Sequence, residues 1–287
     1  MLSRASALGR SSNLLLDKGS MTLPDRNVVD GVGLEIVHSL PWDLHGVETN
    51  GGLDKHKALK LNHWGFVICK AADTDELYGI VGQIQSDHIH QPCLAVPLEG
   101  LDPTSALPQF ALGCGLSIID KAGLELGDTV VVAGANALAL SVLLAASVQG
   151  ARRACLVSIS NEESVYLRNI SRLADVIDES AYASPSDSTL DAFVASSRGR
   201  TVFVDAAGVP NLVQAMTSRL EGSGTLVLCR QDVLTSVQID MYTDIHRKSA
   251  RVVYWARPQD LEEALTLSGC CARAATLFQW RHVTLGL

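Results

Sequence analysis

The sequence contains no run of apolar residues long enough to cross a bilayer, which takes roughly 18–20 residues. The longest run, Ala133 to Val148, includes Asn136 and two serines and predicts a buried helix. The basic residues form no stripe, and the net charge is −8, which argues against a nucleic-acid surface. Neither a Walker loop nor a G-x-S-x-G elbow occurs. We therefore expect a small-molecule substrate, with no membrane and no nucleic-acid partner.

The sequence also has no C-x-x-C pair, although it has 7 cysteines in 287 residues. An odd, dispersed set of cysteines indicates reduced thiols and a cytoplasmic protein. The first residues, MLSRASALGRSSNLLL, contain two arginines and four serines and have no acid before Asp17, which is also typical of a mitochondrial presequence. We interpret residues 1–30 as a leader, either disordered or of this presequence type.

Short apolar runs separated by turn residues follow between residues 31 and 103, and they predict strands of a mainly β domain. The runs are LEIVHSL, HWGFVICKA, LYGIVGQI and CLAVPL. Near residue 104 the sequence pattern changes from short apolar runs to a longer helical segment. A helix is predicted to start near Pro108 and to stop at Gly123.

Strands and helices then alternate, which predicts a parallel sheet covered on both faces. The predicted strands are TVVVA, ACLVSI, ADVID, TVFVDAAG, GTLVLC and ARVVYWA. The predicted helices begin at residues 137, 162, 188, 211 and 258. We expect this domain to cover residues 104–258, with residues 259–287 forming a helix that returns to the β domain.

The turn after the first of these strands has the register of a dinucleotide-binding G-x-G-x-x-G motif, occupied here by Gly134, Asn136 and Ala139. Alanine is tolerated at the third position. Asn136 is a departure, because the second glycine normally lets the backbone approach a diphosphate. The following helix still directs its N-terminus, with Ala137 and Leu138, at the turn. The turn therefore predicts either a modified cofactor site or a βα turn without cofactor.

The second strand carries no acid at its tip, where an NAD site normally has one to bind the ribose hydroxyls. Ser158 and Ser160 stand there instead, and these small hydroxyls leave room for a 2′-phosphate. Arg168 or Arg152 can neutralise that phosphate, whereas Glu162 and Glu163 would oppose it. This pattern favours NADP(H) over NAD(H), if a cofactor binds at all.

In the order of these motifs the chain resembles the medium-chain dehydrogenase/reductase family. The matching segments are CLAVPLEGLDPTSAL, AGLELGDTVVVAGANALAL, QGARRACLVSISNEE, LADVIDES and VFVDAAGVPNLVQAMTSRLEGSGTLVLC. The resemblance implies an α/β fold: a Rossmann-type doubly wound parallel sheet plus a reduced GroES-like, mainly β domain. It also implies that Ala206, Gly208 and Cys229 lie at the cofactor site. A homodimer is expected, because the family commonly pairs through the edge of this sheet and because apolar surface is expected near ATLFQW.

The chain departs from the zinc enzymes of that family. The lobe of four cysteines is absent, and the nearest likeness to the G-H-E motif is LPWDLHGVE, with His45 and Glu48 in altered spacing. We keep His45 and Glu48 as candidate catalytic residues and expect no zinc. Both ends of the catalytic domain resemble shortened versions of the family's.

Two further groups of residues have chemistry by type. His88, His90 and Cys93 can supply three zinc ligands, although a polar strand leading to the linker explains them as well. Tyr78, Tyr242 and His246 can donate protons.

Three functions remain open. The first is a zinc-independent NADP(H)-dependent oxidoreductase acting on a small carbonyl, alcohol or activated alkene. The second is an isomerase, cyclase or lyase on the same fold with degenerate or lost cofactor binding. The third is a non-catalytic partner subunit, because a fold does not fix a function.

Overall fold

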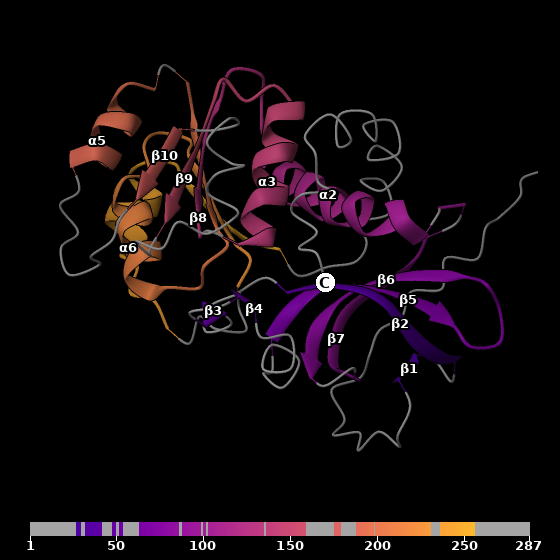
Figure 1. The fold of residues 1–287 in the computed structure, drawn as a ribbon. Helices are drawn as coiled ribbons and strands as arrows, with labels where there is room; N and C mark the ends of the chain where they lie inside the picture. Colours follow the sequence, from indigo (N-terminus) through magenta and orange to yellow (C-terminus); the bar gives the residue numbers. More distant parts are fainter. Residues whose placement is uncertain are drawn as a thin grey trace, which may run out of the picture.

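The structure is a computed structural model of the 287-residue chain. It describes residues 27–29, 32–41, 48–49, 52–53, 63–85, 88–98, 100–101, 103–134, 136–158, 175–178, 188–197, 199–230 and 236–255. The predicted helices at 162 and 258, residues 1–26 of the leader and the segment ATLFQW lie outside these ranges, whereas residues 27–29 of the leader form a strand. Two sheets form the fold, with helix α2 (Pro103–Ala122) between them (Figure 1).

The first sheet is antiparallel and contains the four predicted strands of the β domain together with one short strand before them. Its order is β1-β2-β5-β6-β7. The strands are β1 (Asn27–Val29), β2 (Val32–Pro41), β5 (His63–Ala71), β6 (Leu77–Gln85) and β7 (His88–Pro97). A separate hairpin pairs β3 (Glu48–Thr49) with β4 (Gly52–Leu53).

Both faces of this antiparallel sheet are buried in its central strands. Along β5, Phe66 and Ile68 face the core that includes α2, whereas Val67 and Cys69 belong to a second apolar cluster with Ile80. This alternation follows from the period of two along a strand. The sheet is curved (Figure 1). Apolar residues occur at successive positions of β5 because one set packs toward α2 and the other packs in the second cluster.

The second sheet is parallel and has the order β10-β9-β8-β11-β12-β13. In chain order this is 3-2-1-4-5-6, the doubly wound arrangement. The strands are β8 (Thr129–Ala133), β9 (Arg153–Ser158), β10 (Asp175–Asp178), β11 (Thr201–Asp205), β12 (Thr225–Leu228) and β13 (Arg251–Tyr254). All five pairings are parallel. The predicted alternation of strands and helices is therefore confirmed over the described residues.

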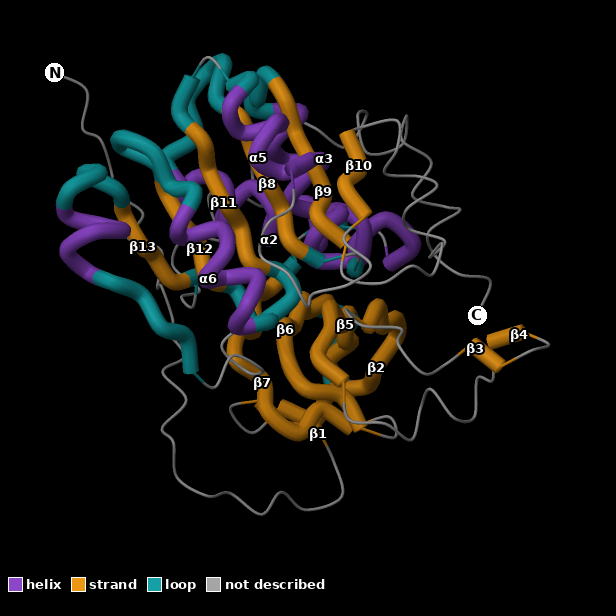
Figure 2. The backbone as a smooth tube through the Cα atoms, turned by 90° about the vertical axis from the view of Figure 1, so that its left-hand side faces the viewer, coloured by secondary structure: helices purple, strands orange, loops and turns teal. Residues whose placement is uncertain are grey.

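Helices cover both faces of the parallel sheet (Figure 2). On one face α2 and α3 (Ala137–Val148) pack against side chains such as Val130 and Val132. On the other face α5 (Ser188–Ala195) and α6 (Pro210–Ser218) pack against Val131 and Phe203. Because β8 is buried on both faces, its sequence is a continuous apolar run.

Helix α2 packs closely against the antiparallel sheet at one glycine and against helix α3 at another. The ring of Phe110 packs edge-on against Phe66 of β5, with 6.0 Å between ring centroids. A Cβ on Gly79 of β6 would lie 2.5 Å from this ring, so only glycine fits there. On its other side α2 crosses α3 at Gly115, where a Cβ would overlap the main-chain carbonyl of Ser141.

The predicted start of α2 is wrong. The helix begins at Pro103, which occupies the first helical position, and Pro108 lies inside the helix. Proline is unfavourable inside a helix because it removes a hydrogen bond. Here the neighbouring Ala106, Leu107 and Phe110 are all buried, and their packing outweighs the local preference.

Candidate functional site

The strand order of the parallel sheet reverses between β8 and β11, and in sheets of this kind ligands bind beside the carboxyl ends at this point. The turns after β8 and β11 therefore form the candidate site. Figure 1 shows this carboxyl edge directed toward the half of the molecule that holds the antiparallel sheet.

Gly134, directly after β8, is required by a close approach between these two turns. Its φ is +113°, a conformation that favours glycine. A Cβ at this position would lie 3.1 Å from the main-chain nitrogen of Ala207 and 3.2 Å from the carbonyl carbon of Ala206. The N–H of Gly134 donates to the carbonyl of Val157 at 2.9 Å, which fixes the turn to β9. The tight turn expected of the first glycine is present.

Asn136 is the N-cap of α3, and its side chain connects the two turns. Its Oδ1 accepts a hydrogen bond from the N–H of Ala139 at 2.8 Å, which is the usual capping bond. Its Nδ2 donates to the carbonyl of Ala206 at 2.7 Å. Only 3% of the residue is exposed. The side chain that replaces the second glycine is therefore a cross-link between the turn after β8 and the turn after β11.

The N-terminus of α3 retains part of its capacity to bind an anion. The N–H groups of Ala137 and Leu138, at the first two helical positions, have no acceptor within the helix. They point along the helix axis toward the turn, where the helix dipole favours negative charge. The third N–H, that of Ala139, is already bound by Asn136. Ala137 and Leu138 are both buried.

The turn after β11 is held by its own carboxylate. Oδ1 of Asp205 accepts hydrogen bonds from the N–H of Ala207 at 3.1 Å and from the N–H of Gly208 at 2.8 Å. Gly208 has a φ of +71°, which permits this bend. Ala206 continues the ladder, because its N–H donates to the carbonyl of Ala133 at 2.9 Å. Hydrogen bonds within the protein therefore fix this turn.

A buried charged residue, Arg230, follows β12 at the same edge of the sheet and is 2% exposed. It comes directly after Cys229, whose N–H donates to the carbonyl of Asp205 at 3.1 Å. Burial raises the pKa of the Cys229 thiol well above its ordinary value; the charge of Asp205 raises it further, and Arg230 opposes both. The thiol is therefore protonated and is not an activated nucleophile.

Sequence reasoning stopped at Cys229 and missed Arg230. The sequence signal was the position of Arg230 directly after an apolar strand, in TLVLCR. A charged residue that is buried at such a position is almost always paired. The structure otherwise brings seven candidate residues to one edge of the sheet: Gly134, Asn136, Ala137, Leu138, Ala206, Gly208 and Cys229.

Other candidate residues lie outside the described residues in whole or in part. Ser158 ends β9, at the predicted strand tip, and Glu48 begins β3, but only their backbone is described. Ser160, Arg168 and His45 lie outside. His88, His90 and Cys93 are on β7, again without a description of their side chains. Across the described ranges, no three His, Cys, Asp or Glu side chains group closely enough to hold a metal ion.

The expectation for Arg152 is wrong. Arg152 directly precedes β9, at the amino end of the strand, and its N–H donates to the carbonyl of Asp128 at 2.7 Å. A ribose phosphate would lie beyond the carboxyl end of that strand, on the opposite edge of the sheet. Arg152 is therefore excluded as its partner, and Arg168 remains the basic candidate.

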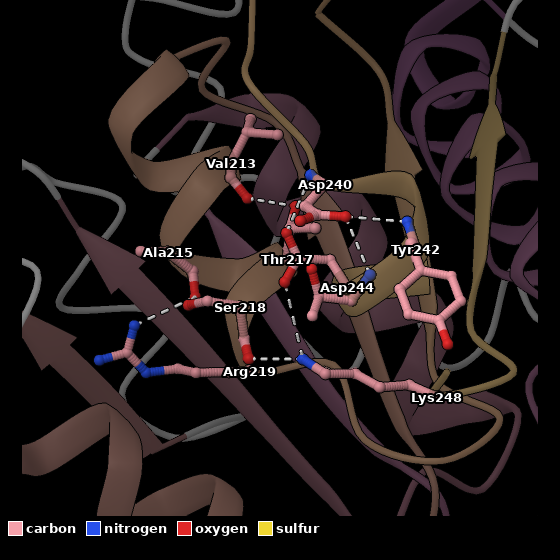
Figure 3. Close-up of polar contacts among 10 residues, drawn as sticks. Val213, Ala215, Thr217, Ser218, Arg219, Asp240, Tyr242, Asp244 and Lys248 are labelled. Atoms are coloured by element: carbon pink, nitrogen blue, oxygen red, sulfur yellow. Dashed lines mark hydrogen bonds and ion pairs between the residues drawn. The ribbon is translucent and has the colours of Figure 1, made fainter. Parts of the chain in front are cut away.

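An open hollow of about 440 Å³ lies at the amino edge of the parallel sheet, beside the last turn of α6. Two basic side chains line it. Nη1 of Arg219 donates to the carbonyl of Ala215 at 3.1 Å, and Nζ of Lys248 donates to the carbonyl of Ser218 at 2.7 Å (Figure 3). Arg219 also pairs with Asp191 at 2.6 Å. These cations stabilise the carboxyl end of α6, where the helix dipole favours positive charge.

The proton donors considered by residue type lie away from the candidate site. The hydroxyl of Tyr78, on β6, donates to Glu76 at 3.2 Å. Tyr242 and His246 stack with 5.8 Å between ring centroids on η1 (Met241–His246), a π-helix between β12 and β13. Tyr242 is exposed. Within the described part of the chain, no helix is long and apolar enough to span a membrane.

No protein-family model matches the chain, and a search of the curated proteins gives no match. Solved structures are similar in fold. The 2R,3R-butanediol dehydrogenase from Bacillus subtilis gives a TM-score of 0.54 at 16% identity over 82% of this chain and 80% of its own. A short chain alcohol dehydrogenase from Escherichia coli CFT073, complexed with NADH, gives 0.53 at 12% identity over 74% and 71%.

An alcohol dehydrogenase zinc-binding domain protein from Burkholderia ambifaria gives a TM-score of 0.50 at 16% identity over 71% of this chain. The match spans only 52% of that protein, about half its length. What these proteins share with the chain is the fold: a Rossmann-type parallel sheet with a GroES-like antiparallel β domain. The predicted fold class, and the likeness to medium-chain dehydrogenases/reductases in fold, are confirmed.

Proposed function

We propose that this protein is a nicotinamide-dependent oxidoreductase acting on a small carbonyl, alcohol or activated alkene. The observation that carries the proposal is the position of the Gly134 turn and the N-terminus of α3 at the point where the strand order reverses. The similar fold of an Escherichia coli dehydrogenase complexed with NADH supports it. The nucleotide, when bound, would supply or accept the hydride.

The residues of the candidate site fit such a cofactor in part. The N–H groups of Ala137 and Leu138 would face the diphosphate, and the turn from Ala206 to Gly208 would border the nicotinamide half together with Cys229. Asp205 holds that turn in place, so it contributes by positioning. The charges of Arg230 and Asp205 both act on the Cys229 thiol, so this edge holds a buried cation and a carboxylate close to the same side chain. Asn136 is the residue that fits least.

We further propose NADP(H) as the cofactor and a reaction without zinc. Ser158 at the end of β9, in place of an acid, leaves room for a 2′-phosphate, and Arg168 would neutralise it. The sequence departs from the zinc enzymes in the missing four-cysteine lobe and in the spacing of His45 and Glu48. These two residues remain the candidate catalytic pair.

The test is a titration of the purified protein with NADPH and with NADH, followed by energy transfer from its 4 tryptophans to the reduced nicotinamide. We expect saturable binding of both, with NADPH binding about tenfold tighter than NADH. In Arg168→Ala this preference should disappear while NADH binding is retained. Equal affinities in the parent protein would contradict the choice of NADP(H), and binding of neither nucleotide would overturn the oxidoreductase.

A second candidate function is an isomerase, cyclase, lyase or partner subunit that uses no dinucleotide. The observation that favours it is the hydrogen bond from Asn136 to Ala206, together with the near-complete burial of Asn136. On this alternative, neither NADPH nor NADH binds, and the same titration decides between the two.

We also propose a homodimer that forms through β13, the last strand of the parallel sheet in the described residues. The two end residues of this strand, Arg251 and Tyr254, are exposed and the two between them are half-buried; Tyr254 is 56% exposed. Antiparallel pairing of two such strands is self-complementary about a two-fold axis. The four described free cysteines, all buried, support the proposal of a reducing, cytoplasmic compartment.

A further inference from the structure

The residue at the second position of the glycine motif is bound to the protein on both sides. Oδ1 of Asn136 accepts from Ala139 of α3, and Nδ2 donates to Ala206, which lies 70 residues further along the chain. Both bonds, at 2.8 and 2.7 Å, are of good length for buried amide groups. Both polar groups of the side chain therefore have hydrogen-bond partners within the protein, which favours the inward conformation.

The location of these bonds matters more than their number. The bond to Ala139 fixes Asn136 at the end of the turn after β8, and the bond to Ala206 ties it to the turn after β11. A dinucleotide would have to lie across these two turns. The close contact of Gly134 with Ala206 and Ala207 brings the same two segments together. In addition, the Cβ of Asn136 stands where a glycine normally lets the backbone approach a diphosphate. The cross-link and the volume of the side chain therefore both oppose the approach of a diphosphate.

We propose that Asn136 sets the affinity of this protein for its dinucleotide, by fastening the two turns together and by occupying the approach to the diphosphate. This inference rests on the proposed function. The nucleotide binds when the hydrogen bond from Asn136 to Ala206 opens, so the measured affinity is lowered by the stability of the closed arrangement. Asn136 is a positioning residue, because it acts through the geometry of the two turns.

The decisive variant is Asn136→Gly, which removes both the cross-link and the Cβ. Glycine is an acceptable N-cap and costs only a few tenths of a kcal/mol relative to asparagine, so the variant should fold. Asn136→Ser is the matched variant: its hydroxyl can still cap α3, but it is too short to bind Ala206 in the same way, and it keeps the Cβ. Asp191→Asn serves as a control, because it weakens the ion pair with Arg219 at the opposite edge.

Binding of NADPH is measured by calorimetry, beside the melting temperature without ligand. We expect Asn136→Gly to bind at least about tenfold tighter than the parent protein, and Asn136→Ser to lie between them. Asp191→Asn should bind as the parent does, even though its melting temperature falls. Tighter binding in Asn136→Gly alone, with none in the parent, would support the inference and remove the proposed function from the natural chain.

Equal or weaker binding by Asn136→Gly, when the parent binds NADPH, would overturn the inference and leave the proposed function intact. In that case the Asn136 amide would be either indifferent to the phosphate or one of its ligands. Binding by neither protein would overturn both.

Discussion

At the scale of single residues, burial controls the chemistry of the cysteines. Cys69 lies in the inner cluster of the antiparallel sheet, and burial raises the pKa of its thiol from 9.0 to about 12. A raised pKa in the folded state means that folding favours the protonated thiol. The associated stability is fully present below pH 9 and is lost as the pH rises toward 12.

We therefore expect the parent protein to lose its stability advantage over Cys69→Ala as the pH rises. The difference in free energy of unfolding should be constant from pH 7 to about 8.5 and should then shrink by as much as about 1.4 kcal/mol per pH unit. Urea denaturation of both proteins at a series of pH values measures it. The comparison removes the titration of lysines and tyrosines, which both proteins share. A difference that stays constant up to pH 11 would contradict the assignment.

The sequence predicted the residues of the candidate site better than their interactions. The register of Gly134 and Asn136 followed from the strand before them, because a glycine motif has fixed spacing. The bond from Asn136 to Ala206 was out of reach, because it joins residues far apart in the chain. Arg152 was misplaced although it precedes the predicted strand ACLVSI in the sequence: the amino end of a parallel strand lies at the edge of the sheet opposite to the ribose phosphate.

At the scale of elements, α2 depends on Gly115. The helix crosses α3 so closely that a Cβ on Gly115 would overlap the carbonyl of Ser141, which belongs to the backbone and cannot rotate away. Because alanine has the better intrinsic helix propensity, by roughly 1 kcal/mol, an isolated helix would gain from the substitution. In this protein the overlap of the new Cβ with Ser141 destabilises the folded state by more than the helix propensity of alanine stabilises it.

We expect Gly115→Ala to lower the free energy of unfolding by roughly 2–3 kcal/mol, because the two helices must separate. Chemical denaturation followed by circular dichroism measures the change. Gly222→Ala is the matched control: the nearest atom to its new Cβ would be the carbonyl oxygen of Lys248 at 3.9 Å, an ordinary contact. An unchanged or raised stability of Gly115→Ala would contradict the described crossing of α2 and α3.

Element types were predictable where periodicity was strong, and element bounds were not. The strands around TVVVA and TVFVD followed from apolar runs flanked by turn residues. The first turn of α2 was missed because Pro108 has the local character of a helix start, whereas tertiary packing carries the helix through it. The π-helix η1 has no comparable sequence signal, and Asp240 closes its first turn by accepting from Tyr242 and Thr243 (Figure 3).

At the scale of the whole molecule, the proposed dimer places its apolar contacts at one end of the parallel sheet. Met241 is 66% exposed on η1, the π-helix before β13, and Tyr254 is 56% exposed on β13 itself. Such side chains are typical of contact surfaces when they occur together.

We expect the parent protein to be a dimer at micromolar concentration by light scattering. Tyr254→Lys should shift it toward the monomer by about tenfold or more in dissociation constant, because a charge would have to be buried at the contact in place of an aromatic ring. Leu126→Lys is the control, since Leu126 is 88% exposed in the turn before β8 and away from β13. A monomeric parent protein would count against the proposal, as would a Tyr254→Lys variant that dimerises unchanged.

The overall architecture was the most predictable feature, because alternating strands and helices admit few arrangements of a parallel sheet. The strand order 3-2-1-4-5-6 follows from right-handed crossovers in two halves. The curl of the antiparallel sheet was harder to predict, because both faces of β5 are buried and its sequence lacks a simple polar alternation.

The ring of Phe110 over Gly79 has a consequence for how the molecule moves. Helix α2 packs on the antiparallel sheet at one glycine, where the contact is with the Phe110 ring, and on α3 at another, where the contact is with the backbone of Ser141. We expect α2 to move together with α3 in any rearrangement of the two halves, because the crossing at Gly115 leaves no room for the two helices to slide past each other.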